Sequence, residues 1–427
     1  MSKHVSILSA CALVASAATL GATSAAQAAN TTSLTHTAVL TGLENPWDMA
    51  FLPDGTMFYT EKCRGLSVRM PDGTVHALLG MKGTDDDFAS TAEDLFCEGQ
   101  AGMMGVAVDP DFEQNRQIFV YSTSDMTAPG TNRLMRMTVG DDFTSVADRT
   151  DIVDDVQYKP KATDHPFGGP GAHNGGRVRF GPDGYIYLTT GDTHNGEVPQ
   201  SPTLIGSKVL RIDRDGNAAA ENTPPEGFDP RTYSYGHRNV QGIAFHPTTN
   251  TPIVAEHGPW HSDEITVLVN GGNAGWDPRP NMAGRGDCPD NYCGYMPNQM
   301  EGMNRFERAA FMPMTDFDTY PEAMPPIWDN NGWSQGTSSA AFLSGSQWGD
   351  WENAMVVGIM GIGFGGTPIG QRIDVIELSE DGTELVDVTE MTLPMAAGRF
   401  RSLVLGPDGA LYAAVDEGDI HKLAPPN

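Results

Sequence analysis

The chain has 427 residues, of which 55 are acidic and 26 are basic, so its formal net charge at pH 7 is −29. A surface of that charge repels nucleic acid and anionic membranes, and both are excluded as partners. We find no linker-like change of composition that would divide the chain into separate domains.

The first 28 residues have the organisation of a secretory signal peptide. A short positive start at 1–4 precedes an apolar run over 5–26, and the small-x-small sequence at 26–28 forms a cleavage site. A transmembrane anchor is the alternative, but the run is rich in Ala, Ser and Thr and only weakly apolar. We therefore expect a periplasmic or secreted protein whose mature chain has no integral membrane segment.

The cysteines fit an exported protein. Loss of Cys11 with the signal peptide leaves an even number of cysteines, and an even number suits disulfide pairing in an oxidising compartment. These cysteines are Cys63, Cys97, Cys288 and Cys293. The last two are close enough in the chain for a local bridge, so the first two form the remaining pair. The absence of a Cys-x-x-Cys spacing disfavours a four-cysteine metal site.

A hairpin phrase recurs along the chain. Alternating apolar residues flank a Pro-Asp-Gly turn at 53–55, 182–184 and 407–409, and related phrases occupy 106–121 and 243–255. A further strand pair without this turn is expected around 341–357. Repeated strand pairs without helical periodicity predict an all-β, six-bladed β-propeller, a single ring formed by residues 29–427. A β-sandwich or several small β-domains is the competing interpretation.

The stretch of about 278–340 interrupts this pattern. It is rich in Met, Pro, Asn and Gly, and we interpret it as a long loop insertion over one face of the ring. Long loops on a rigid scaffold are where binding residues tend to lie, so substrate choice is expected to depend on this stretch.

His173 and Asp192 flank the third hairpin, one before its first strand and one after its second. In an antiparallel pair these positions lie at the same end, so the imidazole and the carboxylate can meet. A carboxylate that orients a histidine is the usual construction of a general base that works near neutral pH. A structural histidine and a turn-capping aspartate are the alternatives.

Eight phrases resemble, in order, those of the soluble quinoprotein sugar dehydrogenases, the glucose/sorbosone dehydrogenase family. They include Ser-Tyr-Gly-His-Arg-Asn-Val-Gln-Gly within 234–247, and the others lie at 42–47, 99–105, 173–192, 206–213, 256–264, 271–276 and 398–409. The resemblance covers most of the mature chain except 278–340. It implies a six-bladed propeller that binds pyrroloquinoline quinone (PQQ) and calcium at one end of the ring.

The resemblance also assigns roles to residues. His173 stands at the position of the catalytic base, Asp192 at that of the acid that orients it, and Arg238 beside the quinone carbonyls. The implied cofactor contacts are Gln100, Arg238, Asn239, Gln241, Arg399 and Arg401. The last two alternate on one strand, so they share a face and match the pair that grips the cofactor carboxylates; solvated strand arginines are the alternative.

Calcium is expected to bind the backbone carbonyls of Gly258 and Pro259, by the same resemblance. Asp263 and Glu264 are candidates for a second, structural calcium because calcium prefers oxygen donors, although turn residues would look the same. His237 and His257 are expected to pack and to donate hydrogen bonds.

One departure from the family pattern concerns a lysine near the cofactor. The family carries it in a Ser-Leu-Lys phrase of the fifth blade, whereas this chain has no lysine between Trp351 and Glu380. Gly361 occupies the corresponding place, and Arg372 is a candidate for supplying the missing charge.

The function implied is PQQ- and calcium-dependent oxidation of an aldose sugar at C1 to the lactone. His173 would abstract the hydroxyl proton, and PQQ would accept hydride, which no protein side chain can do. The electron acceptor would be external, since the chain has no Cys-x-x-Cys-His haem motif. A propeller lactonase dependent on calcium, or a non-catalytic binding module, is the alternative.

Overall fold

The computed structural model describes residues 33–84, 87–160, 169–259, 261–278, 302, 304–361 and 370–426. The predicted signal peptide at 1–28 and the predicted Cys288–Cys293 pair lie outside them. Among the helices within the described ranges, none is both long enough and apolar enough to cross a membrane.

Within the described residues, the strands form six sheets of four or five strands each. Blade 1 consists of β2 (Pro46–Phe51), β3 (Met57–Glu61), β4 (Gly65–Arg69), β5 (Val75–Met81) and β6 (Ser90–Ala92). Blade 2 consists of β7 (Met103–Val108), β8 (Gln117–Ser124), β9 (Thr131–Val139) and β10 (Val146–Val156). Blade 3 consists of β11 (Val178–Phe180), β12 (Ile186–Thr189), β13 (Lys208–Ile212), β14 (Thr232–Tyr235) and β18 (Gly272–Asn273).

The second half of the chain forms the other three blades. Blade 4 consists of β15 (Val240–Phe245), β16 (Pro252–Glu256), β17 (Glu264–Val267) and β19 (Pro326–Asp329). Blade 5 consists of β20 (Thr337–Phe342), β21 (Met355–Ile359), β22 (Arg372–Leu378) and β23 (Leu385–Glu390). Blade 6 consists of β24 (Phe400–Leu405), β25 (Leu411–Val415), β26 (Asp419–Ala424) and β1 (Thr35–Leu40). The helical elements described are α1 (Phe112–Asn115), α3 (Arg305–Phe311) and the 3₁₀ segment η1 (Ser346–Trp351).

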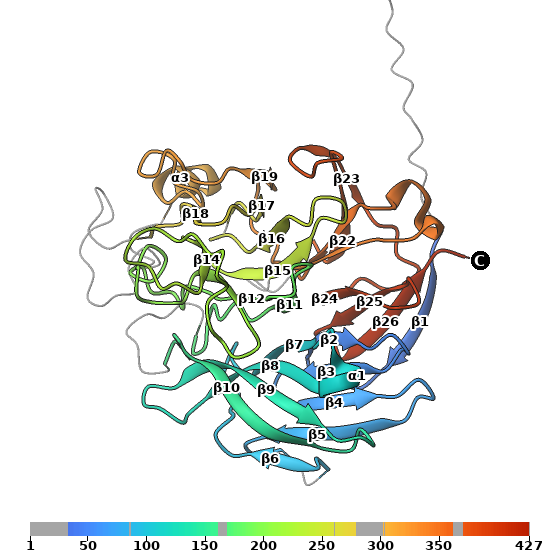
Figure 1. Cartoon of the computed structure of the whole chain (residues 1–427). Coiled ribbons are helices and arrows are strands. Elements are labelled where there is room, and N and C mark those ends of the chain that lie inside the picture. The colour runs from blue at the N-terminus through green and yellow to red at the C-terminus, as the bar shows by residue number, and fades with distance from the viewer. Residues whose placement is uncertain are drawn as a thin grey trace, which may run out of the picture. The chain divides into compact units, whose positions relative to one another are not determined.

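The first strands of the blades close a ring. β2 contacts β7, β7 contacts β11, β15 contacts β20, and β24 contacts both β20 and β2, while blades 3 and 4 meet through β12 and β15. The ring is fastened by β1, which pairs antiparallel with β26, so that the first and last strands share blade 6 (Figure 1). The predicted six-bladed propeller is confirmed, including the fifth blade that lacks the turn phrase.

The Pro-Asp-Gly phrases form the tight turns between the first two strands of blades 1, 3 and 6. In blade 1, Gly55 has a φ of +92°, and the Asp54 carboxylate accepts a hydrogen bond of 2.9 Å from the backbone N–H of Thr56. Glycine adopts this φ without steric strain, and aspartate satisfies the turn backbone. Gly184 repeats the conformation in blade 3, with a φ of +81°.

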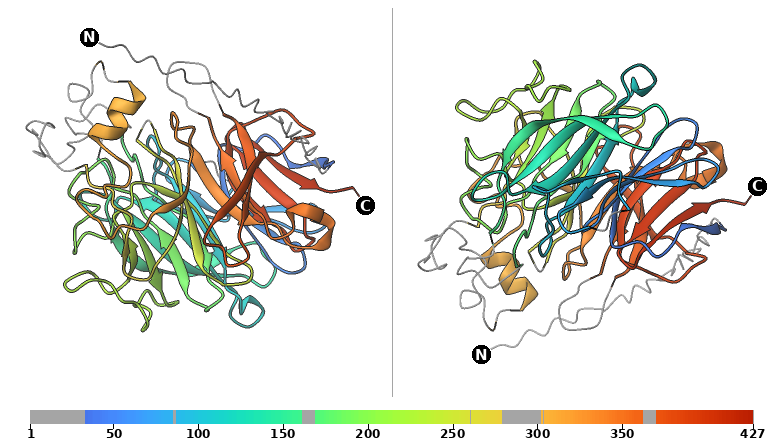
Figure 2. Two further views of the ribbon diagram at one scale, coloured as in Figure 1. Left: turned by 90° about the horizontal axis from the view of Figure 1, so that it is seen from above. Right: turned by 90° about the horizontal axis from the view of Figure 1, so that it is seen from below.

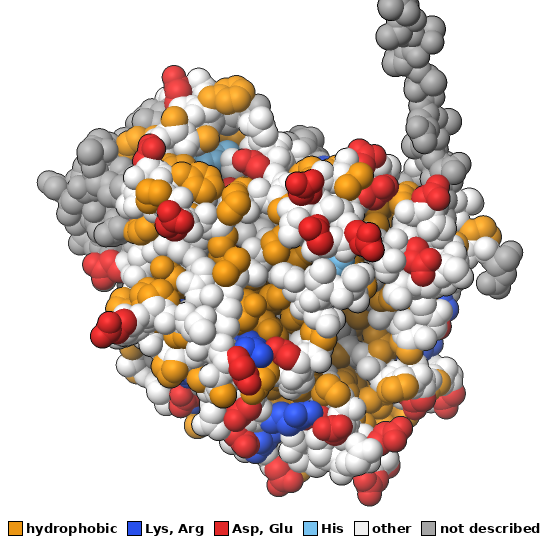
Figure 3. Space-filling view, turned by 45° about the horizontal axis from the view of Figure 1, so that its top comes forward, with side chains coloured by type: hydrophobic (Ala, Val, Ile, Leu, Met, Phe, Trp, Pro, Cys, Tyr) orange, Lys and Arg blue, Asp and Glu red, His pale blue; other side chains and the backbone are white. Residues whose placement is uncertain are grey.

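Apolar side chains fill the spaces between neighbouring blades. One cluster joins Phe58 and Leu66 of blade 1 to Val106 and Val120 of blade 2, all of them fully buried. Full burial of such a side chain contributes about 1.5–3 kcal/mol. Acidic side chains are spread over the outer surface in Figure 3, with few lysines and arginines among them, as the net charge predicts.

The stretch predicted as an insertion, 278–340, contains regular elements. The structure describes α3, β19 and the start of β20 in it, whereas 279–301 and 303 lie outside the described residues. The outer strand of blade 4 therefore follows the irregular segment, because β19 pairs antiparallel with β17. Both views of Figure 2 place α3 at the edge of the ring, far from the strands of blade 6.

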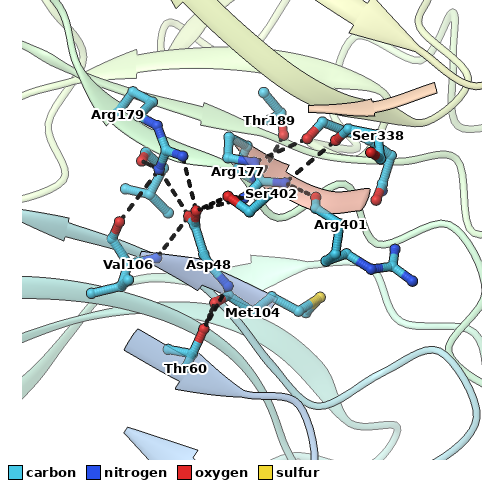
Figure 4. Close-up of polar contacts among 12 residues, drawn as sticks. Asp48, Thr60, Met104, Val106, Arg177, Arg179, Thr189, Ser338, Arg401 and Ser402 are labelled. Atoms are coloured by element: carbon cyan, nitrogen blue, oxygen red, sulfur yellow. Dashed lines mark hydrogen bonds and ion pairs between the residues drawn. The ribbon is translucent and has the colours of Figure 1, made fainter. Parts of the chain in front are cut away.

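The centre of the ring is closed by a buried polar cluster around Asp48 (Figure 4). Its carboxylate binds Arg177 at 2.6 Å, Arg179 at 2.8 Å and the Ser402 hydroxyl at 2.8 Å. Burial alone would raise the pKa of Asp48, but Arg177 and Arg179 outweigh it and lower that pKa to about 2.

The Arg177 guanidinium extends this cluster to blades 4, 5 and 6. It donates to the carbonyl oxygens of Gln241 at 3.0 Å, Ser338 at 3.3 Å and Arg401 at 2.9 Å. It also stacks over Trp47, with 4.4 Å from its carbon to the ring centroid. Together with the bond from the Val106 N–H to Asp48, these contacts tie the inner strands of all six blades to one network.

Candidate functional site

A cavity of about 350 Å³ lies beside this central cluster. Its wall contains Trp47, the apolar side chains of Met104 and Met360, and three amide side chains that were predicted as cofactor contacts. The amides are Gln100, Asn239 and Gln241. Arg399 and Arg401 also line the cavity, so the structure brings five of the predicted cofactor-binding residues together.

His173 and Asp192 meet as the hairpin predicted. The Nδ1 of His173 lies 2.7 Å from Oδ1 of Asp192, and both residues are buried. The Nε2 of His173 lies 3.2 Å from Nη2 of Arg238. A guanidinium only donates, so Nε2 of His173 must accept, and the ring proton resides on Nδ1 and is donated to Asp192. This tautomer presents a basic lone pair on Nε2.

The two backbone segments that carry His173 and Asp192 approach each other closely. A Cβ on Gly191 would lie 2.1 Å from the carbonyl oxygen of His173, so only glycine permits the two segments to approach. His173 itself has a φ of +55°, in the left-handed region. The Asp192 N–H donates to the Arg238 carbonyl at 2.8 Å, which joins the hairpin to the motif at 234–247.

Two further donors, not predicted from the sequence, bind Asp192. The indole Nε1 of Trp276 donates to Oδ2 of Asp192 at 2.8 Å, and the backbone N–H of His194 donates to Oδ1 at 2.9 Å. The Nε2 of His194 also lies 2.8 Å from Nε2 of His173. Burial, followed by the electrostatic effect of the neighbouring His173, holds the pKa of His194 well below its usual value, which favours a neutral ring that donates this bond.

The Arg238–Asn239 segment is fixed by a carboxylate. Glu256 accepts hydrogen bonds from the backbone N–H groups of both Arg238 and Asn239, and its other oxygen lies 3.0 Å from Nδ1 of His237. Oδ1 of Asn239 accepts from the Gly175 N–H at 3.0 Å and from the Gln241 amide at 3.1 Å. These bonds use the oxygen of Asn239 and leave its NH₂ group for the cavity.

Arg399 immediately precedes β24 and Arg401 is the second residue of that strand. Both bind Asp416: Arg401 through Nε at 2.8 Å and Nη2 at 2.7 Å, and Arg399 through Nε at 3.1 Å. The Nη1 of Arg399 also donates to the Gly361 carbonyl at 3.0 Å. Their side chains are only 31% and 18% exposed, so they are cavity residues and not solvated arginines of the surface.

The predicted calcium residues lie next to the cavity. A Cβ on Gly258 would lie 2.0 Å and 2.4 Å from the carbonyl oxygens of His261 and Ser262, so backbone oxygens gather around this glycine. Asp263 accepts hydrogen bonds from Gly258 N–H at 2.8 Å and from four groups of residues 334–337, and Arg238 donates to the carbonyl of His257.

Glu264 lies apart from Asp263 in its hydrogen bonding, since it accepts from the Thr315 hydroxyl at 3.0 Å. Burial and the nearby carboxylates of Glu256 and Asp329 raise the pKa of Glu264 well above its usual value. No group of three or more His, Cys, Asp or Glu side chains arranged for a metal occurs in the described part of the chain. The two calcium assignments therefore stay predictions.

The residue predicted at the place of the family's lysine, Gly361, contributes a backbone group. Gly361 lines the cavity and its carbonyl accepts from Arg399. Arg372, the candidate for replacing the charge, is instead bound to Asp374 by two hydrogen bonds of 2.7 Å and 2.8 Å and is not among the described cavity-lining residues. A lysine from another blade, Lys62, lines the cavity instead.

The family model named Glucose / Sorbosone dehydrogenase matches residues 43–422 of this chain. The chain belongs to this family. The resemblance of the motifs is thereby confirmed, and the propeller is that of a sugar dehydrogenase, an oxidoreductase.

Relatives of the glucose/sorbosone dehydrogenase family match over nearly the whole chain. The aldose sugar dehydrogenase YliI of Escherichia coli is 28% identical, over 90% of this chain and 91% of the relative. Quinoprotein glucose dehydrogenase B of Acinetobacter calcoaceticus is 26% identical, over 90% of this chain and 86% of the relative.

Solved structures of this family share the fold. A putative glucose dehydrogenase of Thermus thermophilus superposes with a TM-score of 0.66 at 27% identity, covering 92% of this chain and all of the other. The PQQ-bound aldose sugar dehydrogenase of Streptomyces coelicolor has a TM-score of 0.64 at 22% identity, covering 92% and 98%.

The cavity fits PQQ by the chemistry of its wall. PQQ is a planar tricarboxylate, and arginines match carboxylates bidentately, while amide side chains suit carbonyl oxygens and an indole suits a flat ring. The wall offers all three kinds of group, and none of the described lining residues is an aspartate or a glutamate. Among the functional residues missed from the sequence, Trp276 had a signal, since it ends one of the family phrases.

Proposed function

We propose that the protein oxidises an aldose sugar at C1 to the lactone, with PQQ and calcium as cofactors. The observation that carries this proposal is the state of His173. Its Nδ1 proton is donated to Asp192, and its Nε2 is an acceptor that contacts Arg238 and His194; the next residue, Asn174, lines the cavity of arginines and amides.

His173 would act as the general base. Removal of the C1 hydroxyl proton requires an acceptor within hydrogen-bond reach, and Nε2 is the only ring nitrogen that can accept in this tautomer. Asp192 would then stabilise the imidazolium that forms and would keep the ring in place. The sugar hydroxyl would replace the His194 N–H at Nε2, because both groups need the same lone pair.

Arg399 and Arg401 of the cavity wall would hold the carboxylates of PQQ, and Asn239, Gln241 and Arg238 would contact its carbonyl oxygens. When bound, PQQ supplies the electrophilic carbonyl that accepts hydride from the sugar. Arg399 and Arg401 are pre-oriented for this role because Asp416 fixes both guanidinium groups. Gln100 would lie between the sugar and the cofactor, next to His173, whose N–H is 3.5 Å from its Oε1.

Calcium would bind at the carbonyl oxygens of Gly258 and Pro259, in the turn that Asp263 organises, and Asp263 and Glu264 remain candidates for a second ion. Export to the periplasm or medium and an external electron acceptor complete the proposal. Export rests on the first 28 residues, and the acceptor on the lack of a haem motif.

The test is reconstitution of the purified apoprotein with PQQ and calcium, followed by dye reduction with a panel of aldoses. We expect sugar-dependent reduction that requires both additions. The His173→Ala variant should bind PQQ as wild type does and should show no turnover. Full activity after treatment with a calcium chelator would rule out the calcium requirement, and retention of most of kcat by His173→Ala would remove this residue from the mechanism.

The lactonase alternative has less support. It needs acidic side chains gathered on a calcium ion at the centre of the ring, whereas the central carboxylate, Asp48, is ion-paired to Arg177 and Arg179. Hydrolysis of lactones by the purified protein without any quinone would revive it.

A further inference from the structure

The cavity has a third cation that no motif of the family indicated. Lys62 directly follows β3 and lines the cavity together with Arg399 and Arg401. Its ammonium donates a hydrogen bond of 2.9 Å to the carbonyl of Gly99. No carboxylate within the described ranges forms an ion pair with it, so two of its three N–H donors are left for a ligand.

The charges on this wall are unbalanced. Three cations, Lys62, Arg399 and Arg401, face one buried carboxylate, Asp416, which leaves a local charge of about +2 in a chain whose formal net charge is −29. Burial, and then the charge of Arg401, lower the pKa of Lys62, while Asp416 opposes them. An occupant with two or more carboxylates would relieve this repulsion.

The backbone of Lys62 is held from three sides. Its N–H donates to the Asn45 carbonyl at 3.1 Å, and its own carbonyl accepts from the Met103 N–H at 2.8 Å. A Cβ on Gly102 would lie 2.2 Å from that carbonyl, so a glycine is required beside it. The backbone of the lysine is thus fixed, and its partly buried side chain reaches the carbonyl of Gly99.

A disulfide reinforces this placement. Cys63, the residue after Lys62, is bonded to Cys97, and the segment that follows Cys97 carries both Gly99 and Gln100. The bridge therefore ties the lysine to its hydrogen-bond acceptor and to a second cavity residue. Blade 1 contributes a cation at the cavity, whereas the described lining residues next to the strands of blade 5, Gly336, Met360 and Gly361, carry no charge.

We propose that Lys62 binds a carboxylate of PQQ and supplies, from blade 1, the positive charge that this chain lacks in blade 5. This inference rests on the proposed function, since it requires PQQ to be the occupant of the cavity.

The experiment is a titration of the intact, calcium-loaded protein with PQQ, followed by quenching of tryptophan fluorescence, for which Trp47 lines the cavity. Lys62→Met removes the charge and keeps the aliphatic chain, Lys62→Arg keeps the charge, and Lys82→Met is the control. Lys82 is a surface lysine, 54% exposed and paired with Asp125 at 3.1 Å.

We expect Lys62→Met to raise the Kd for PQQ by about 10- to 100-fold, the range for a hydrogen bond to a charged group. The Kd of Lys62→Arg for PQQ should stay within a few-fold of the wild-type Kd, and the Kd of Lys82→Met should equal it. The salt dependence of Kd should be weaker in Lys62→Met than in wild type. Circular dichroism and Tm identify any variant that fails to fold, and Lys62→Gln then takes its place.

Wild-type affinity and wild-type salt dependence in a folded Lys62→Met protein would overturn the inference and leave the proposed function intact. A wild-type protein that does not bind PQQ at all would overturn the proposed function, and the inference with it.

Discussion

The Asp192→Asn variant tests how much the Asp192 carboxylate contributes to the action of His173 as the general base. Among the described residues, Asp192 accepts hydrogen bonds from Nδ1 of His173 and the His194 N–H at Oδ1, and from Trp276 at Oδ2. Asparagine has one acceptor and one NH₂ group, so at least one of these donors faces another donor. An unpaired buried donor costs about 1–3 kcal/mol. With an unfolding entropy of about 0.8 kcal/mol/K for ~400 residues, this corresponds to a Tm about 1–4 °C lower.

The effect on turnover should be much larger than the effect on stability. Loss of the carboxylate removes the group that fixes the proton on Nδ1 of His173 and that stabilises the imidazolium, so kcat should fall by about 10²- to 10⁴-fold. The Kd for PQQ should change by less than about twofold, because Asp192 does not line the cavity.

The assay combines steady-state dye reduction at saturating PQQ with a PQQ titration of each protein. Trp276→Phe is the matched control, since it removes the donor to Oδ2 and leaves the His173–Asp192 hydrogen bond in place. We expect it to lower Tm and to retain far more of kcat. An Asp192→Asn protein with near wild-type kcat would refute the assignment of His173 as the oriented base.

Three other predictions concern stability. Asp48→Asn should destabilise the ring by about 3–5 kcal/mol, the cost of breaking a buried ion pair. Because the pKa of Asp48 falls from 3.8 to about 2 on folding, its contribution of about 2 kcal/mol is present above pH 3.8 and is lost as the pH falls through about 2, which acid unfolding of wild type and variant measures. The pKa of His194 is lower in the folded than in the unfolded protein. Its contribution to the free energy of unfolding is therefore complete above about pH 6.5 and declines below that pH. Wild type should then lose about 1–2 °C of Tm per pH unit more than His194→Gln, and parallel pH curves would contradict this. The Cys63–Cys97 bridge spans 34 residues, so the Cys63→Ser, Cys97→Ser double variant should lose up to about 4 kcal/mol in urea unfolding, and labelling should find both thiols blocked in unreduced wild type.

The sequence was informative wherever local chemistry determines structure. The Pro-Asp-Gly turns require glycine at positive φ and aspartate to cap the turn, so they identified hairpins of blades 1, 3 and 6 directly. The His173–Asp192 contact followed from the same logic, because antiparallel pairing brings the two ends of a hairpin together. Both predictions depend on neighbours within about twenty residues.

Contacts between residues that are far apart in the chain could not be predicted from the sequence in this way. Asp48 and Arg179 are 131 residues apart, and nothing in either strand indicates that closure of the ring will bring them together. The same holds for Lys62 and Arg401, which share one cavity wall although they belong to different blades. Arg372, the candidate for supplying the missing charge, does not line the described cavity for a local reason. Asp374 on the same strand accepts hydrogen bonds from both Nε and Nη2 of its guanidinium.

The central claim is that the cation-lined cavity binds PQQ. Titration of Arg401→Ala and Arg399→Ala with PQQ in calcium buffer tests it most directly. Each variant should fold as wild type does and bind PQQ more weakly by about 2–5 kcal/mol, the usual penalty for breaking a buried charge pair, with little change in sugar KM once PQQ saturates. Wild-type affinity for PQQ in both variants would contradict the account.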